Sequence, residues 1–417
     1  MKLLTKSVHK GRTYNIWAYR FMRLVFGTLV RMLHRPVPIG RENMPTTGPC
    51  FIISNHSGMY DSFILNYLVK DESFAGIMTD EFLRKGFLPF LLKQLGTVAT
   101  RKFQPQTTPV RDLIRLVQDN RMIVLMPEGE SNWDGTTLPT VASTGKLFRA
   151  MKVPVYPVTI HNGYLAFPRW ANWPRAVKIY VEYRPPLHFT KEMTDEQVAE
   201  MVDAAIRYDP LKPDSKITPK RVLSYQPARK ITRLIFRCPN CGDADGLDEI
   251  RGKYLACYKC GEKWRVHGDS TLTNIRTRER HSATELFRQI CRMPRPTLDF
   301  GAQGKGLIRT PDILVSKETE YPHQQSLGRF DGILREDRIA LLPRGIQDAI
   351  TIPLSELRSL SNELKKKCQL RTDDEMYQIT FRQGSSLHWQ IYIKDILPHL
   401  DERLVRPTDF ATGHSPV

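Results

Sequence analysis

A histidine and an aspartate, five residues apart, follow an apolar segment near residue 50. The segment CFIIS ends at residue 54, and the stretch NHSGMYD then presents His56 and Asp61. An aspartate that accepts the Nδ1 proton of a histidine fixes its tautomer and raises the basicity of Nε2. Five residues of straight helix turn the chain by about 140°, so the pair needs a bend, which Ser57 and Gly58 can supply. The pattern indicates general-base chemistry; the alternative is a polar pair that stabilises the start of a helix.

Two later stretches place charged residues where a site could include them. The stretch LGTVATRK has Arg101 and Lys102 after a glycine. The stretch LMPEGES ends an apolar segment with Glu128 and Gly129. The carboxylate should therefore lie at the carboxyl end of a sheet, where such folds commonly bind ligands. The alternative for Arg101 and for Glu128 is an ordinary charge on the surface.

The stretch VPVYPV, residues 153–158, carries Pro154 and Pro157 within a strand-like segment. Proline lacks the N–H that a central strand donates to its neighbour. The segment is therefore expected to be an edge strand, or a constrained strand at a functional site.

An alternation of strands and helices must position these stretches. Apolar runs predict buried strands at 49–54, 121–128, 153–160 and 177–183. Helical patterns lie at 61–70, 80–96, 108–119, 144–152 and 190–210. Strands that alternate with helices indicate an α/β domain with a mostly parallel sheet flanked by helices.

The stretches NHSGMYD, GTVATR, PEG and VPVYPV resemble the four motifs of the glycerophospholipid acyltransferases, in order and in approximate spacing. This family includes the 1-acylglycerol-3-phosphate acyltransferases, and the resemblance covers about residues 36–190. It implies the family's fold and the transfer of an acyl group from acyl-CoA or acyl carrier protein. The acceptor would be the free hydroxyl of a lysophospholipid, here 1-acylglycerol 3-phosphate, and the product phosphatidic acid.

The resemblance also implies residue roles. His56 would be the general base, and Asp61 would orient it. The other residues would bind the acceptor and shape its pocket: Arg101 and Lys102 at the phosphate, Glu128 and Gly129 beside it, and Pro154 and Pro157 around it.

The chain departs from the family pattern after Pro-Glu-Gly. The family usually continues with a small residue and then arginine, whereas this chain continues with Glu130, Ser131, Asn132, Trp133 and Asp134. The change removes a phosphate contact and adds a negative charge. It leaves two alternatives open: an acyltransferase for another lysophospholipid, or a catalytically silent lipid-binding scaffold.

Two CxxC pairs, CPNCG and CYKCG, predict a zinc ribbon. The expected ligands are Cys238, Cys241, Cys257 and Cys260. Four thiolates leave no open coordination position, so the zinc should be structural. Basic and aromatic residues around the pairs could contact a nucleic acid. We do not favour that partner, because the acyltransferase motifs already account for a basic surface.

The charge distribution indicates an anionic membrane surface as a partner. The net charge is +18, and residues 1–40 contain eight Lys or Arg and no acidic residue. Apolar residues alternate there with arginines, a pattern typical of an amphipathic helix at an interface. We found no signal peptide and no clear transmembrane span. The chain has seven cysteines, an odd count, and four of them are clustered in the CxxC pairs. This usage indicates a reducing compartment, so we expect a peripheral protein on the cytoplasmic face of the membrane.

These patterns divide the chain into four predicted parts. Residues 1–35 form the membrane-associating helix, 36–215 the acyltransferase domain, 228–268 the zinc ribbon, and 269–417 a β-rich accessory domain. Short strands and a closing helix in the last part resemble a small barrel of the pleckstrin-homology-like kind. Such modules bind lipids or proteins.

Overall fold

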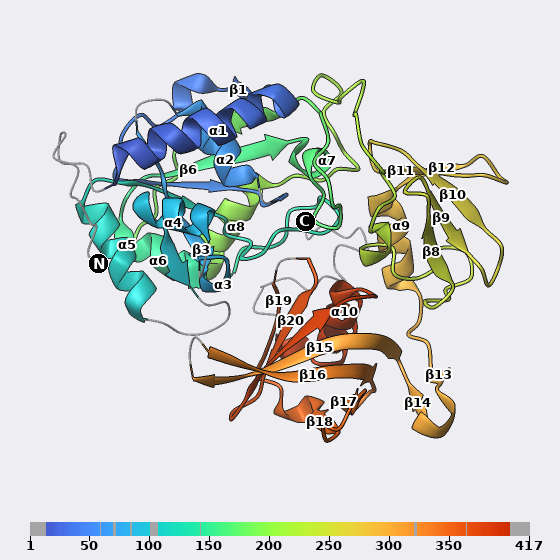
Figure 1. Ribbon diagram of the computed structural model, residues 1–417. Coiled ribbons are helices and arrows are strands. Elements are labelled where there is room, and N and C mark those ends of the chain that lie inside the picture. Colours follow the sequence, from blue (N-terminus) through green and yellow to red (C-terminus); the bar gives the residue numbers. More distant parts are fainter. Residues whose placement is uncertain are drawn as a thin grey trace. The chain divides into compact units, whose positions relative to one another are not determined.

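The computed structural model describes residues 14–58, 60–69, 72–83, 86–100, 107–141, 143–320, 323–363 and 365–400 (Figure 1). These residues form two compact units. The first runs up to Arg169 and continues from Trp173 to Tyr225. The second runs from Gln226 onward and includes the short segment Trp170–Asn172.

The first unit is built on a seven-stranded sheet with the order β1-β7-β6-β2-β5-β3-β4. Its strands are β1 (Val37–Ile39), β2 (Cys50–Ser54), β3 (Ala75–Thr79), β4 (Val98–Thr100), β5 (Met122–Leu125), β6 (Val155–His161) and β7 (Tyr180–Tyr183). Neighbouring strands run parallel except β6 and β7, which are antiparallel. The predicted α/β class with a mostly parallel sheet is confirmed.

Helices cover both faces of this sheet (Figure 1). They are α1 (Ile16–His34), α2 (Asp61–Leu68), α3 (Asp80–Leu83), α4 (Phe87–Gln94), α5 (Thr107–Gln118), α6 (Ser143–Met151), α7 (Gly163–Ala166) and α8 (Asp195–Ile206). Successive side chains of a strand point to opposite faces. Ile52 of β2 therefore packs with α1 and α2, while its neighbours Phe51 and Ile53 pack with α5, α6 and α8.

Strand β6, which carries Pro157, lies inside the sheet, so the expectation of an edge strand is wrong. It pairs with β2 on one side and with β7 on the other. The carbonyl of Pro157 accepts the N–H of Arg184, one residue beyond the end of β7 (3.1 Å). The N and C=O of a strand residue point to the same side, so the missing N–H falls where the partner strand has ended. Pro154 precedes β6 and donates nothing to the ladder.

The single helix expected over 80–96 is divided into α3 and α4. Gly86 lies between them with φ 125°, a conformation outside the helical region. Pro89 follows in the first turn of α4, where a missing N–H costs no helical bond.

Helix α1 exposes much of its apolar surface. Trp17, Leu24 and Met32 are 71%, 70% and 72% exposed, whereas Met22 and Val30 are buried. Asn15 caps the helix by accepting the N–H groups of Trp17 and Ala18. Across the described ranges, no helix combines the length and the apolarity needed to cross a membrane.

The second unit begins with a five-stranded antiparallel sheet, in the order β12-β11-β10-β9-β8. Its strands are β8 (Leu247–Ile250), β9 (Tyr254–Cys257), β10 (Lys263–Val266), β11 (Thr271–Asn274) and β12 (Arg280–Ser282), and helix α9 (Ala283–Arg292) follows. A capping box starts α9, with the side chains of Ser282 and Glu285 bonding each other's backbone N–H.

A larger antiparallel sheet makes up the rest of the second unit, in the order β18-β17-β16-β15-β21-β20-β19. Its strands are β15 (Ile308–Glu320), β16 (His323–Leu334), β17 (Arg338–Pro343), β18 (Ile350–Pro353), β19 (Ser359–Glu363), β20 (Lys367–Arg371) and β21 (Met376–Phe381). The short pair β13 (Leu298–Asp299) and β14 (Lys305–Gly306) precedes it, and α10 (Ser386–Ile396) closes it. Trp389 of α10 is buried in the core of this module. The predicted β-rich module with a closing helix is confirmed.

Candidate active site and metal site

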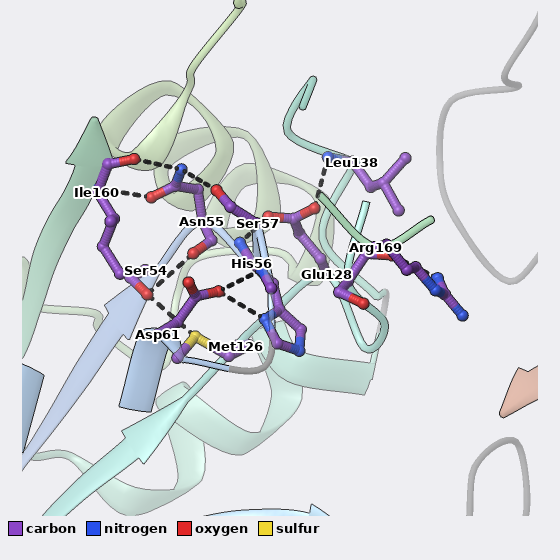
Figure 2. Close-up of polar contacts among 12 residues, drawn as sticks. Ser54, Asn55, His56, Ser57, Asp61, Met126, Glu128, Leu138, Ile160 and Arg169 are labelled. Carbon is purple, nitrogen blue, oxygen red and sulfur yellow. Dashed lines mark hydrogen bonds and ion pairs between the residues drawn. The ribbon is translucent and has the colours of Figure 1, made fainter. Parts of the chain in front are cut away.

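His56 lies in the turn between β2 and α2 and contacts Asp61, the first residue of α2. Nδ1 of His56 is 2.9 Å from Oδ2 of Asp61 (Figure 2). The same Asp61 oxygen accepts the N–H of Gly58 at 2.9 Å. The Asp61 side chain is 2% exposed, while the His56 side chain is 26% exposed. The ring can thus meet a substrate while the carboxylate that holds it is shielded from water.

Asn55 anchors this turn to the neighbouring strand β6. Its side-chain oxygen accepts the N–H of Ile160 (2.7 Å), and its side-chain nitrogen donates to the carbonyl of Ile160 (3.1 Å). These paired bonds extend the β2–β6 ladder by a side chain where the backbone leaves the sheet. The sequence analysis did not identify Asn55. The only signal was a polar side chain directly after a buried strand.

Glu128 holds the backbone of His56. It is fully buried, and one carboxylate oxygen accepts the N–H of His56 (Figure 2). The other oxygen accepts the N–H of Leu138 at 2.8 Å. The carbonyl of His56 accepts the N–H of Asn132 at 2.9 Å. The loop after β5 therefore fixes both backbone polar groups of His56.

Gly129 occupies the tight turn next to Glu128. Its φ is 70°, and a Cβ there would lie 2.9 Å from Cγ2 of Val141. Both reasons favour glycine at this position. Glu128 and Gly129 lie beyond the carboxyl end of β5, and Glu128 contacts the backbone of His56.

The negative charge of Glu130 has a buried partner that the sequence analysis did not identify. Nη1 of Arg169 lies 3.3 Å from Oε2 of Glu130, and both side chains are 4% exposed. The same guanidinium donates to the carbonyl of Ser131 and lies 4.4 Å from the ring centroid of Trp133. Arg169 follows Glu130 by 39 residues, so no local spacing could have indicated the pair.

Of the remaining predicted site residues, the structure describes Pro154 and Pro157. Arg101 and Lys102 lie outside the described residues. Pro157 pairs with Ile53 of β2, close to the turn, whereas Pro154 lies just before the amino end of β6, where its carbonyl accepts the N–H of Phe51.

The four predicted zinc ligands form one cluster in the second unit. Their Sγ atoms all lie within 4.8 Å of one another, with 3.6 Å between Cys238 and Cys260 and 3.7 Å between Cys241 and Cys257. A zinc ion bound tetrahedrally at about 2.3 Å would require sulfur separations of about 3.8 Å, so the cluster fits the ion.

The turns of this cluster are shaped by glycine. Gly242 and Gly261 have φ 75° and 76°, and each donates its N–H to the carbonyl of the first cysteine of its CxxC pair. Each turn thereby brings its two thiols to one side.

Comparison with known proteins finds similarity within the first unit. A family model described as Acyltransferase matches residues 37–161. A 1-acyl-sn-glycerol-3-phosphate acyltransferase from Limnanthes alba is 27% identical over 209 residues, covering 46% of this chain and 72% of that protein. A protein of the same name from Borreliella burgdorferi is 24% identical over 156 residues, covering 36% and 61%.

A solved structure also matches. The 1-acyl-sn-glycerophosphate acyltransferase PlsC from Thermotoga maritima is 20% identical, with a TM-score of 0.39, over 46% of this chain and 76% of that chain. The family match spans β1 to β6 and includes His56, Asp61 and Glu128. Residues 37–161 of this chain therefore contain an acyltransferase domain, similar to those of 1-acyl-sn-glycerol-3-phosphate acyltransferases.

Proposed function

We propose that the protein transfers a fatty acyl group from acyl-CoA or acyl carrier protein to the free hydroxyl of 1-acylglycerol 3-phosphate, which yields phosphatidic acid. The observation that carries the proposal is the contact between the part-exposed His56 ring and the buried Asp61 carboxylate. A carboxylate at Nδ1 keeps the proton on that nitrogen and leaves Nε2 as the base. We assign the transfer to residues 36–215 and accessory roles to 228–268 and 269–417.

In the proposed reaction, His56 Nε2 takes the proton of the acceptor hydroxyl as its oxygen attacks the thioester carbonyl. A C–O bond forms, and the tetrahedral intermediate then collapses with loss of the C–S bond. The leaving thiolate takes the proton back from His56. Arg101 and Lys102 would hold the acceptor phosphate, since guanidinium and ammonium groups both pair with phosphate oxygens.

The hydrogen bonds of Glu128 favour a role in positioning the backbone of His56. Both of its oxygens accept backbone N–H groups, one from His56 and one from Leu138. We propose that Glu128 contributes to the acceptor site by holding this backbone.

The test is thioester-dependent thiol release, measured with and without lysophosphatidate. Wild-type protein should release thiol only when the acceptor is present. We expect His56→Ala to lower kcat about a thousandfold, within the range of lost general-base catalysis. His161→Ala is the matched control, because His161 also bonds a carboxylate, Glu182 at 2.8 Å, and should retain activity.

The same assay separates the alternatives. A folded wild-type protein that releases no thiol with any lysolipid would support the silent scaffold. Turnover with another lysophospholipid but not with lysophosphatidate would support a different acceptor. The specific observation behind that second candidate is the loop after Gly129, where a buried ion pair stands in place of a free cation.

We further propose that α1 holds the protein at an anionic membrane surface, on the cytoplasmic side. Besides Trp17 and Leu24, the exposed apolar residues include Phe87 of α4, whose ring centroid lies 5.8 Å from that of Phe21. At the other end of α1, Arg31 and Arg35 line a surface pocket of about 730 Å³ with apolar residues such as Met32 and Tyr67. Exposed apolar side chains beside cations suit a surface of anionic lipid.

We also propose that Cys238, Cys241, Cys257 and Cys260 hold a structural zinc ion. These four thiolates would fill the coordination positions of the ion and would leave none for a substrate. The ion would stabilise the fold of the ribbon and take no part in acyl transfer.

A further inference from the structure

The segment that follows β6, residues 163–169, contacts the turn that carries His56. A Cβ on Gly58 would lie 2.9 Å from the carbonyl oxygen of Phe167. A Cβ on Gly163 would lie 3.1 Å from the side chain of Ser57. The Phe167 ring also lies 5.1 Å from that of Tyr60, between centroids. The segment and the turn therefore pack without room for an added methyl group.

The carboxyl end of the same segment, at Arg169, contacts the loop after β5. Arg169 bonds Glu130 and the carbonyl of Ser131 and covers the ring of Trp133. Tyr164 packs against this loop too, since a Cβ on Gly135 would lie 2.7 Å from its ring. One segment thus contacts both stretches of chain that meet at His56.

The Arg169 contacts cannot be reproduced by another cation. A guanidinium is planar and can bond a carboxylate and a carbonyl while its face lies on an indole ring. An ammonium group is a compact charge without that fork. Glu130 is buried, so removal of the Arg169 charge would raise the cost of burying its carboxylate and would release one contact that holds the loop.

Movement of this loop would displace the backbone of His56, because the residues held by Arg169 are next to those that bond His56. Ser131, held by Arg169, directly precedes Asn132, whose N–H bonds the carbonyl of His56. On the other side, Glu130 lies two residues from Glu128, which bonds the N–H of His56. The loop therefore connects Arg169 to both backbone groups of the base.

We propose that Arg169 is a positioning residue for acyl transfer. It clamps the loop after β5 through Glu130, Ser131 and Trp133, and thereby sets where the His56 ring meets the acceptor hydroxyl. The inference rests on the proposed function. It also gives the unusual residues after Gly129 a role, because they form the binding site for the Arg169 side chain.

The first experiment compares Arg169→Lys with wild type in steady-state transfer assays. We expect kcat to fall about ten- to a hundredfold, as displacements of about 1 Å can cause, while KM for the thioester changes less than about twofold. Arg184→Lys is the matched control. Arg184 also bonds a carboxylate, of Glu182, and a backbone carbonyl, of Ala205, but away from the His56 loop, so its kcat should stay at the wild-type value.

A second comparison separates positioning from simple stability. Arg169→Met should lower both Tm and kcat. The double variant Glu130→Leu/Arg169→Met removes both buried charges, so its Tm should recover, because replacing a whole buried pair is commonly neutral. Its kcat should stay low, because the bond to Ser131 and the contact with Trp133 are still missing. Recovery of both Tm and kcat would overturn the inference, as would wild-type kcat in Arg169→Lys.

The outcomes distinguish this inference from the proposed function. If wild type transfers no acyl group, the proposed function fails first. If wild type is active and His56→Ala is not, but the Arg169 variants keep wild-type kcat, only the positioning role fails.

Discussion

At the scale of single residues, the site is a set of polar groups that hold one another at fixed positions. Asp61 holds the His56 ring, Glu128 holds the His56 backbone, and Asn55 holds the turn against Ile160. Each bond is made by a buried group whose alternative partner, water, is excluded. An unmade bond there would carry the full desolvation cost, which favours one arrangement over its neighbours.

Asp203 of α8 fixes the far end of the same loop, and its protonation provides a pH-dependent prediction. Its Oδ1 accepts the N–H of Thr140 at 2.9 Å and also the Thr140 hydroxyl. Burial raises the pKa of Asp203 above its ordinary value, despite these two bonds and the nearby Arg207, which act in the opposite direction. The folded protein therefore holds this proton more tightly than the unfolded chain does. The resulting stabilisation of the fold is fully present below about pH 4, the usual aspartate range, and is lost as the pH rises through the pKa of Asp203 in the folded protein.

We therefore expect Asp203→Asn to increase the free energy of unfolding at pH 7. The amide keeps an oxygen that can accept both Thr140 bonds without a buried charge. Urea unfolding at pH 7 and at acid pH measures the difference, and the advantage of the variant should disappear below about pH 4. A variant less stable than wild type at pH 7 would show that the charged hydrogen bonds outweigh the burial of the carboxylate.

At this scale, the sequence can indicate contacts between residues that are close along the chain. The bend between His56 and Asp61 follows from helical rotation and from Ser57-Gly58, and the pair does meet in that turn. Asn55 and Arg169 could not be recognised, because their partners lie 105 and 39 residues away along the chain. Only the strand order and the path of the segment after β6 bring those partners together.

At the scale of elements, α1 leaves several of its apolar side chains exposed. Met22 and Val30 are buried, but Trp17 and Leu24 remain exposed, although both belong to the same short apolar pattern. The periodicity of the sequence predicted a two-sided helix. It could not indicate which apolar residues the core would leave uncovered, because that depends on where α2 and α4 pack.

The membrane proposal predicts that these exposed side chains contribute to lipid binding. Burial of a large apolar side chain is worth about 1.5–3 kcal/mol, so Trp17→Ser/Leu24→Ser should weaken vesicle binding at least about tenfold. Sedimentation with phosphatidylcholine vesicles, with and without phosphatidylglycerol, measures the loss. Both positions are exposed, so the fold should be retained.

Ile346→Ser supplies the matched control for this experiment. Ile346 is fully exposed and lies in the second unit, between β17 and β18. Its replacement removes the same kind of apolar surface and should leave vesicle binding unchanged. Equal binding by wild type and the α1 double variant would contradict the proposed docking through α1.

At the scale of the whole molecule, the sequence predicted the kinds of domain better than their internal arrangement. Three local patterns each correspond to a part of the structure. They are the alternation of strands and helices, the paired CxxC turns, and the short strands separated by polar turns. The reversal at β7, which places β1 and β7 antiparallel to the rest, has no local signature. In this antiparallel register β7 ends beside Pro157, so the missing N–H of the proline faces no strand residue.

The two compact units lead to a prediction about metal removal. The four cysteines belong to the second unit, and His56 with its supporting loop belongs to the first. Zinc bound by four thiolates contributes of the order of 10 kcal/mol to the folding of such small ribbons. We expect Cys238→Ser/Cys257→Ser to lose one zinc ion per chain by elemental analysis and to lower the Tm of the second unit, while kcat for acyl transfer stays near the wild-type value.

Cys291→Ser is the control for that variant, because Cys291 is an exposed thiol outside the cluster. It should keep the zinc ion and the wild-type Tm. Wild-type protein that contains no zinc after expression with the metal supplied would contradict the metal assignment. A double variant that loses both zinc and acyl transfer, while the first unit keeps its own Tm, would contradict the separation of the two functions, because the ribbon would then be needed for the chemistry at His56.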